Sequence, residues 1–161
     1  MDRDETLNPD SGYISDPKHF TLFNWVAPEL RRLKDAGFLL VVVSNQSGIG
    51  RGLIQWDALR EIHLKMNQLL ADASGVQIDE FAICPHKPDD ECECRKPKPT
   101  LILNTALKRS IDLKQSFMIG DRKSDYEAGV AAGVKESFLI HPGDEHSFKM
   151  AVEAILKSGL S

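Results

Sequence analysis

The chain has 161 residues, of which 42% are hydrophobic, and a formal net charge of −4 at pH 7. This length suits one sizeable core, so we expect one domain over residues 1–161, and we take a monomer as the default. Lys and Arg are interspersed with Asp and Glu and form no basic stripe, so we expect no nucleic-acid partner. No apolar run reaches the roughly 20 residues that cross a bilayer, and the first residues are charged where a signal peptide is apolar. We therefore expect a cytoplasmic protein with no membrane partner.

Helical and extended patterns alternate along the chain. Apolar residues at helical spacing precede Gly37, and the apolar run 38–43 then predicts a strand buried on both faces. The later predicted elements are a helix over 56–70, a strand over 78–84, a helix over 101–109, a strand over 116–119, a helix over 125–132, a strand over 137–140 and a helix over 147–157. Repeated β-α units predict an α/β fold with a mostly parallel sheet and helices on both faces.

The segment 85–99 is predicted to be a long structured loop, and it begins next to a cluster of metal-ligand residue types. The cluster consists of Cys84, His86, Cys92 and Cys94. Three thiols and an imidazole suit tetrahedral Zn²⁺, and a site filled by four protein ligands is structural because no position remains for an activated water. The alternative is a set of buried cysteines without a metal. An odd number of cysteines in a tight cluster disfavours a disulfide framework and agrees with a reducing compartment.

Two carboxylates, Asp2 and Asp4, lie two residues apart at the start of the chain. At an extended strand end both would project from the same side, so one can attack a phosphorus atom while the other handles protons. A cation must neutralise the repulsion between the two anions, and Mg²⁺ fits because it takes carboxylate and phosphate oxygens. Such a pair alone is more often a solvated turn, so this interpretation depends on motifs further along the chain.

Three polar segments supply those motifs. Residues 44–47 follow the first predicted strand, where ligands bind in parallel sheets, and their hydroxyl and amide groups suit phosphoryl oxygens. Lys96 suits the charge of a transition state, and Arg95 suits forked recognition of a second anionic group. Asp121 follows the predicted strand 116–119 and suits Mg²⁺, whereas Asp125 is interpreted as an N-cap or first-turn acid.

The order Asp-x-Asp-x-Thr, strand-Ser-Asn, Lys-Pro, strand-Gly-Asp-x-x-x-Asp resembles the four motifs of the haloacid dehalogenase (HAD) phosphatases, and the match runs through the whole chain. Finer details are similar to the D-glycero-D-manno-heptose 1,7-bisphosphate 7-phosphatases, with the histidinol-phosphate phosphatases as close relatives. These details are Asp-Arg-Asp-x-Thr-Leu-Asn, Gly12-Tyr13-Ile14, Ser-Asn-Gln-Ser-Gly-Ile-Gly-Arg-Gly, and Cys-Pro-His followed by Cys-x-Cys-Arg-Lys-Pro. The resemblance implies a HAD-like, Rossmann-like fold without a large cap domain.

The resemblance also implies a role for each motif. Asp2 would become phosphorylated, while Asp4 would protonate the leaving sugar oxygen and then activate water. Ser44 and Lys96 would hold the transferring phosphoryl group. Catalytic Mg²⁺ would be bound by Asp2, the backbone carbonyl of Asp4 and Asp121. The residues expected to contact the substrate are Asp10, Ser11, Gly12, Tyr13, Asn45, Gln46, Ser47, Arg95 and Arg122.

The implied function is removal of the 7-phosphate from a heptose bisphosphate, on the way to the sugar nucleotides of lipopolysaccharide. Arg95, placed for a second phosphate, favours this substrate. Hydrolysis of histidinol phosphate in histidine biosynthesis is the alternative activity, and a non-catalytic zinc-stabilised HAD-like protein is the alternative of another class. That class is suggested by a departure from the family, which has a buried strand before its first Asp where this chain has Met1 alone. We therefore expect the first strand to be missing, Asp2 to be poorly held, and either a truncated start or a compromised activity.

Overall fold

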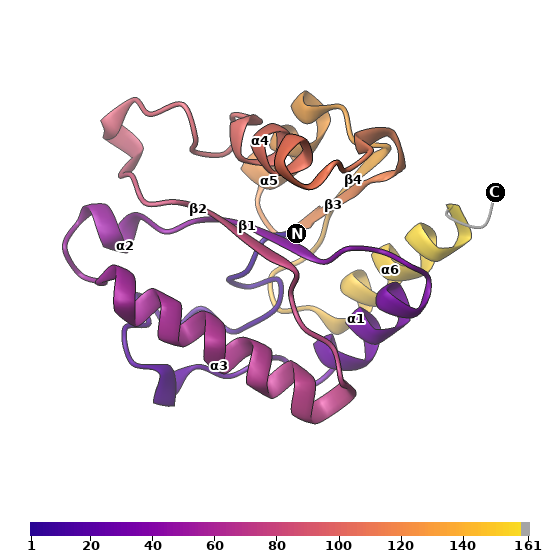
Figure 1. Cartoon of the computed structure of the whole chain (residues 1–161), viewed down its shortest axis with the longest axis horizontal. Helices are drawn as coiled ribbons and strands as arrows, with labels where there is room; N and C mark the ends of the chain where they lie inside the picture. Colours follow the sequence, from indigo (N-terminus) through magenta and orange to yellow (C-terminus); the bar gives the residue numbers. More distant parts are fainter. Residues whose placement is uncertain (159–161) are drawn as a thin grey trace.

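The computed structural model describes residues 1–158, which form three layers (Figure 1). The middle layer contains the strands β1 (Val41–Asn45), β2 (Glu80–Cys84), β3 (Phe117–Gly120) and β4 (Glu136–Leu139). Helices α4 (Thr100–Arg109) and α5 (Lys123–Ala132) lie on one side, and α1 (Val26–Asp35), α3 (Trp56–Ser74) and α6 (Glu145–Ser158) lie on the other. Shorter helices are η1 (Pro17–His19), α2 (Ser47–Gly50), η2 (Pro88–Asp90) and η3 (Leu113–Gln115). The predicted α/β fold with helices on both faces is confirmed.

The strand predicted over 38–43 begins later than expected, at Val41. The reason is the end of α1, where Gly37 has a φ of 89° and the N–H of Phe38 donates to the carbonyl oxygen of Leu33. Residues 38–40 are therefore used in the turn from helix to strand. The short helix α2, which follows β1 directly, was not predicted.

The strands form two separate parallel pairs, β1–β2 and β3–β4, and not one continuous sheet. The first two residues join the pairs. The terminal amino nitrogen of Met1 donates to the carbonyl oxygen of Val41 (2.8 Å). The N–H of Val43 donates to the carbonyl oxygen of Met1 (2.8 Å), and the N–H of Asp2 donates to that of Ile119 (2.9 Å). Met1 and Asp2 thus bond to both β1 and β3, although the structure of residues 1–158 assigns them to neither strand pair.

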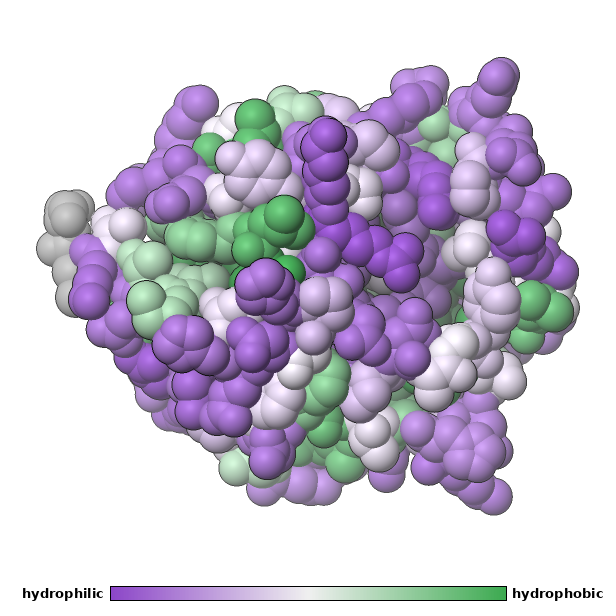
Figure 2. Space-filling model, turned by 180° about the vertical axis from the view of Figure 1, so that it is seen from behind, coloured by the Kyte–Doolittle hydropathy of each residue, from purple (hydrophilic) through white to green (hydrophobic). Residues whose placement is uncertain are grey.

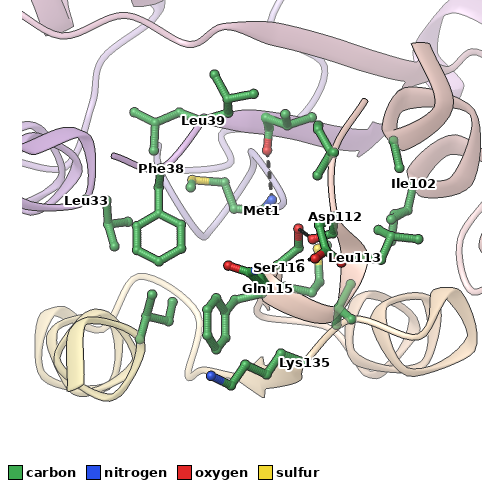
Figure 3. Close-up of a pocket in the computed structure, with 18 of the residues that line it drawn as sticks. Met1, Leu33, Phe38, Leu39, Ile102, Asp112, Leu113, Gln115, Ser116 and Lys135 are labelled. Carbon is green, nitrogen blue, oxygen red and sulfur yellow. Dashed lines mark hydrogen bonds between the residues drawn. The ribbon is translucent and has the colours of Figure 1, made fainter. Parts of the chain in front are cut away.

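A cavity of about 590 Å³ lies between the two strand pairs, beside Met1 (Figure 3). Leu33, Phe38, Ile102 and Leu113 contribute apolar side chains to its wall. Within the described part of the chain, its lining includes none of the residues predicted to bind phosphate, substrate or metal. Asp112, Gln115, Ser116 and Lys135 also line the cavity, so its wall is partly polar.

Both faces of β1 and β3 are buried. Val42 packs into the larger hydrophobic core with residues of α1, α3 and α6, whereas Val43 and Met118 pack against Ile102 of α4 and Ala128 of α5. Burial on two sides fixes the strands, and with them the loops at their carboxyl ends.

The surface is mixed in character. Across residues 1–158, every helix is too short or too polar to cross a membrane. Exposed large apolar residues include Leu107 and Met150. On the face in Figure 2, hydrophobic areas lie between hydrophilic residues that cover most of the surface. Apolar residues scattered in this way are normal for folded domains.

Candidate active site

Three carboxylates gather at the carboxyl ends of the strands. Asp2 lies between β1 and β3, Asp121 follows β3, and Asp125 lies in the first turn of α5. Each offers an oxygen atom within 4.8 Å of those of the other two. Asp2 is 6% exposed, and its N–H is bonded to β3, so the expectation that it is poorly held was wrong.

A buried lysine links two of these acids. Lys96 is 3% exposed, and its Nζ lies 2.8 Å from Oδ1 of Asp2, 2.6 Å from Oδ1 of Asp125 and 2.6 Å from the carbonyl oxygen of Val43. Burial lowers the pKa of Lys96, but the charges of Asp2 and Asp125 outweigh burial and raise the pKa above its usual value. The lysine therefore remains a cation between two anions.

Sequence reasoning missed the role of Asp125 in this arrangement. Its Oδ2 accepts from the N–H of Arg122 (2.9 Å), as expected of a first-turn acid, but its Oδ1 also pairs with Lys96. The position four residues after Asp121 was the available signal, since it places Asp121 just before α5 and Asp125 in the first turn of that helix.

The carboxylates fit the predicted magnesium site. Burial raises the pKa of Asp121 to about 6, and the charge of Asp2 adds to this effect. Thr6 Oγ1 donates to Oδ1 of Asp121 (3.1 Å). Three carboxylates around one lysine leave excess negative charge, and carboxylate oxygens are the ligands that Mg²⁺ prefers. The set includes Asp125, which was not expected, and does not include the carboxylate of Asp4.

The carboxylate of Asp4 is held by three other side chains. Arg3 donates to it through Nε (3.0 Å) and Nη2 (2.9 Å), Asn8 through Nδ2 (3.0 Å) and Gln46 through Nε2 (2.9 Å). Burial raises the pKa of Asp4, but Arg3 and these hydrogen bonds outweigh burial and lower it. Between Asp4 and Asn8, Glu5 adopts a φ of 59°, in the left-handed region that favours glycine.

The predicted substrate-binding residues differ in their surroundings. Asn45 is joined to the backbone of Lys96 by two hydrogen bonds (3.0 and 3.2 Å), so it fixes the lysine. The exposed residues of the segment 10–13 lie near α2, because a Cβ atom placed on Gly48 would come 2.7 Å from Tyr13 Cδ1. Arg122 is exposed beside Asp121, at 4.0 Å.

The four predicted zinc ligands come together. Cys84 Sγ lies 3.6 Å from Cys92 Sγ and 3.0 Å from Cys94 Sγ, and Cys92 and Cys94 are 3.8 Å apart. His86 Nδ1 lies 3.6 Å from Cys84 Sγ and 3.2 Å from Cys94 Sγ. A tetrahedral zinc with Zn–S bonds of about 2.3 Å requires sulfur atoms about 3.8 Å apart. The two distances to Cys92 are close to this value, and Zn²⁺ would require Cys84 and Cys94 to separate from 3.0 Å. The residue types and their proximity are compatible with Zn²⁺.

The zinc loop is connected to the phosphate-binding side of the molecule. Arg95 Nη1 donates to the carbonyl oxygen of His86 (3.2 Å), and the N–H of Gly50 in α2 donates to Pro85 (2.9 Å). Burial and the neighbouring Cys94 raise the pKa of Cys84 to about 12, so a thiolate at this position needs a cation beside it. Loosening the loop would therefore shift Arg95 and its neighbour Lys96.

Comparison with known proteins gives consistent matches. Residues 93–147 match the HAD-hydrolase-like family model. The chain is 39% identical over 140 residues to the D-glycero-beta-D-manno-heptose-1,7-bisphosphate 7-phosphatase of Helicobacter pylori, covering 87% of this chain and 81% of that protein. It is 38% identical over 150 residues to the enzyme of the same name from Escherichia coli, covering 89% and 78%.

A solved structure is similar over nearly its whole length. It is the D,D-heptose 1,7-bisphosphate phosphatase from B. bronchiseptica, complexed with magnesium and phosphate. The TM-score is 0.87 at 30% sequence identity, covering 98% of this chain and 96% of that one. The chain therefore belongs to the HAD-like phosphatase family that includes the D-glycero-beta-D-manno-heptose-1,7-bisphosphate 7-phosphatases.

Proposed function

We propose that this chain is a magnesium-dependent phosphatase that removes the 7-phosphate of D-glycero-D-manno-heptose 1,7-bisphosphate, in the synthesis of lipopolysaccharide precursors. The observation that carries the proposal is the buried ion pair of Asp2 with Lys96, at the edge where Ser44 lies near the end of β1 and Asp121 follows β3. The names of the relatives supply the substrate. A cytoplasmic location and a monomeric state remain predictions.

The first half of the reaction transfers the phosphoryl group to the enzyme. Oδ1 of Asp2 accepts from Lys96, so we assign the attack on phosphorus to Oδ2. The bond between phosphorus and the sugar oxygen breaks, and Asp4 gives its proton to that oxygen. Lys96 and Ser44 hold the phosphoryl oxygens during the transfer. Magnesium bound by Asp2, Asp121 and the Asp4 carbonyl, with Asp125 beside them, would neutralise the charge between the two anions.

The second half releases phosphate and restores the enzyme. The Asp4 carboxylate takes a proton from a water molecule, whose oxygen attacks the phosphorus of the aspartyl-phosphate. The bond to Asp2 breaks, and inorganic phosphate leaves. Asp4 then carries the proton that the next sugar oxygen receives, so the cycle balances. The hydrogen bonds that lower the pKa of Asp4 favour the carboxylate form that this half requires.

The proposed zinc site is structural. Cys84, His86, Cys92 and Cys94 would fill all four positions around Zn²⁺, which excludes a zinc-bound water. The hydrogen bond of Arg95 to His86 would transmit the shape of the loop to the substrate side.

The test is phosphate release from heptose 1,7-bisphosphate and from histidinol phosphate, side by side, with and without Mg²⁺. Asp2→Asn is the test variant, and Asp57→Asn, which changes an exposed acid on α3, is the control. We expect preference for the bisphosphate, abolished only in Asp2→Asn. Preference for histidinol phosphate would favour the alternative enzyme, and no release from either by a folded, zinc-loaded chain would favour a non-catalytic protein.

A further inference from the structure

We propose that Gln46 is a positioning residue that ties the acid–base carboxylate of Asp4 to the phosphoryl-binding hydroxyl of Ser44. The inference rests on the proposed function for the roles of Asp4 and Ser44. Its own basis is a pair of hydrogen bonds made by one buried amide.

Gln46 is 5% exposed and follows β1 directly. Its Nε2 lies 2.9 Å from Oδ2 of Asp4 and 2.8 Å from Oγ of Ser44. An ionised carboxylate only accepts hydrogen bonds, so the amide nitrogen must face Asp4. The nitrogen carries two hydrogens, and these two contacts use both.

The amide sets the direction of the Ser44 hydroxyl. Because Oγ of Ser44 accepts from Gln46, its own O–H proton remains available to another acceptor. A phosphoryl oxygen at the end of β1 is the acceptor that the proposed reaction brings to this place. Gln46 thereby prepares the serine as a donor before the substrate binds.

The same amide adds a hydrogen bond to those that Arg3 and Asn8 donate to Asp4. Arg3 is 2% exposed and its Nε and Nη2 point at Asp4, while its Nη1 has no hydrogen-bond partner among residues 1–158. Asn8 is fully buried and likewise leaves its Oδ1 without a partner in the described chain. Buried polar groups normally find partners. Two side chains therefore leave polar atoms unpaired while they hold Asp4. Gln46 donates to Oδ2 at 2.9 Å, where Nη2 of Arg3 makes a longer hydrogen bond of 3.2 Å.

The backbone of Gln46 is fixed as well. Its N–H donates to the carbonyl oxygen of Cys84 (2.8 Å), the last residue of β2. The position of the amide is thus set by the strand pair. Both side-chain N–H groups are thus used inside the protein, and the contact of Gln46 with the sugar stays a prediction.

The experiment compares two substrates with different leaving groups. An aryl oxide leaves without being protonated, whereas a sugar alkoxide needs the proton of Asp4. In Gln46→Met, which keeps the length and removes both donors, we expect kcat/KM for heptose bisphosphate to fall about 10- to 100-fold, in the range of general acid catalysis. For p-nitrophenyl phosphate we expect a loss of no more than about threefold, from the weaker hold on Ser44. Gln55→Met, at the exposed residue before α3, is the matched control.

Equal losses on both substrates, or no loss, would overturn the inference while leaving the phosphatase intact. If the unmodified chain released phosphate from neither substrate, the proposed function would fail first. Crystal structures of the unmodified chain and of Gln46→Met then test the positioning role without depending on activity. We expect the Asp4 carboxylate to move away from its place in Gln46→Met, and an unmoved carboxylate would refute the role of Gln46.

Discussion

Replacing Lys96 by Met is expected to destabilise the fold strongly in the absence of metal. The Lys96 side chain is 2% exposed and its two partners, Asp2 and Asp125, are 9% and 1% exposed. Removing one member of a buried ion pair costs about 3 to 5 kcal/mol because it leaves an uncompensated charge. Val43 also loses a donor to its carbonyl oxygen, which adds about 1 kcal/mol. Urea unfolding in the presence of EDTA should therefore show a loss of about 4 kcal/mol or more.

A second substitution separates charge from packing. In the Lys96→Met background, Asp125→Asn removes one buried charge that has no partner, so we expect the free energy of unfolding to recover by about 1 to 2 kcal/mol. In the unmodified chain, Asp125→Asn should instead lower the free energy of unfolding. Lys149→Met is the control, because this exposed lysine pairs with Glu145 on its own helix, and such a pair is worth no more than about 0.5 kcal/mol. A loss below about 1 kcal/mol in Lys96→Met would refute the reasoning that this ion pair holds the strand ends together.

Three further substitutions test other parts of the molecule. Cys92→Ser should raise KM about tenfold and leave kcat within a few-fold, because the loop carries the cations that face the substrate. Steady-state kinetics combined with analysis of the bound metal tests this prediction. Unchanged kinetics in a variant that has lost its zinc would contradict it. Burial lowers the pKa of His63 from 6.5 to about 4, so the stability it contributes is complete above pH 6.5 and is lost as the pH falls towards 4. Between pH 7 and pH 4.5 the unmodified chain should lose about 2 to 3 kcal/mol more of its free energy of unfolding than His63→Phe loses. Equal losses in the two chains would contradict this. Gly120→Ala should cost about 1 to 3 kcal/mol by thermal unfolding, because the new methyl group would overlap the Asp125 side chain; an unchanged midpoint would contradict that overlap.

The alternating helices and strands could be predicted from the sequence, because the buried face of each element produces a regular spacing of apolar residues. The helix predicted over 56–70 exists as α3, with buried Leu59, Ile62 and Met66 on one face and Gly75 in the left-handed conformation at its end. The zinc cluster was also readable, since four ligand residue types lie within eleven positions and come together in space. Both features depend on local spacing alone.

Features that depend on contacts between distant segments were not readable. The sequence gives no sign that Lys96 reaches Asp125, or that Asn45 is used by the backbone of Lys96. The contacts of the Gln46 amide with Asp4 and Ser44 were not predicted, because the motif gives the position of this side chain and not its direction. The division of the strands into two pairs joined through Met1 likewise follows from three-dimensional pairing.

The central claim is that Asp2 becomes covalently phosphorylated, and the most direct measurement is rapid-quench mass spectrometry of the intact chain during turnover of heptose 1,7-bisphosphate with Mg²⁺. The account predicts a transient species heavier by one phosphoryl group, with the modification located at Asp2, and no such species in Asp2→Asn. Turnover by Asp2→Asn, or a phosphoryl group found on another residue, would contradict it.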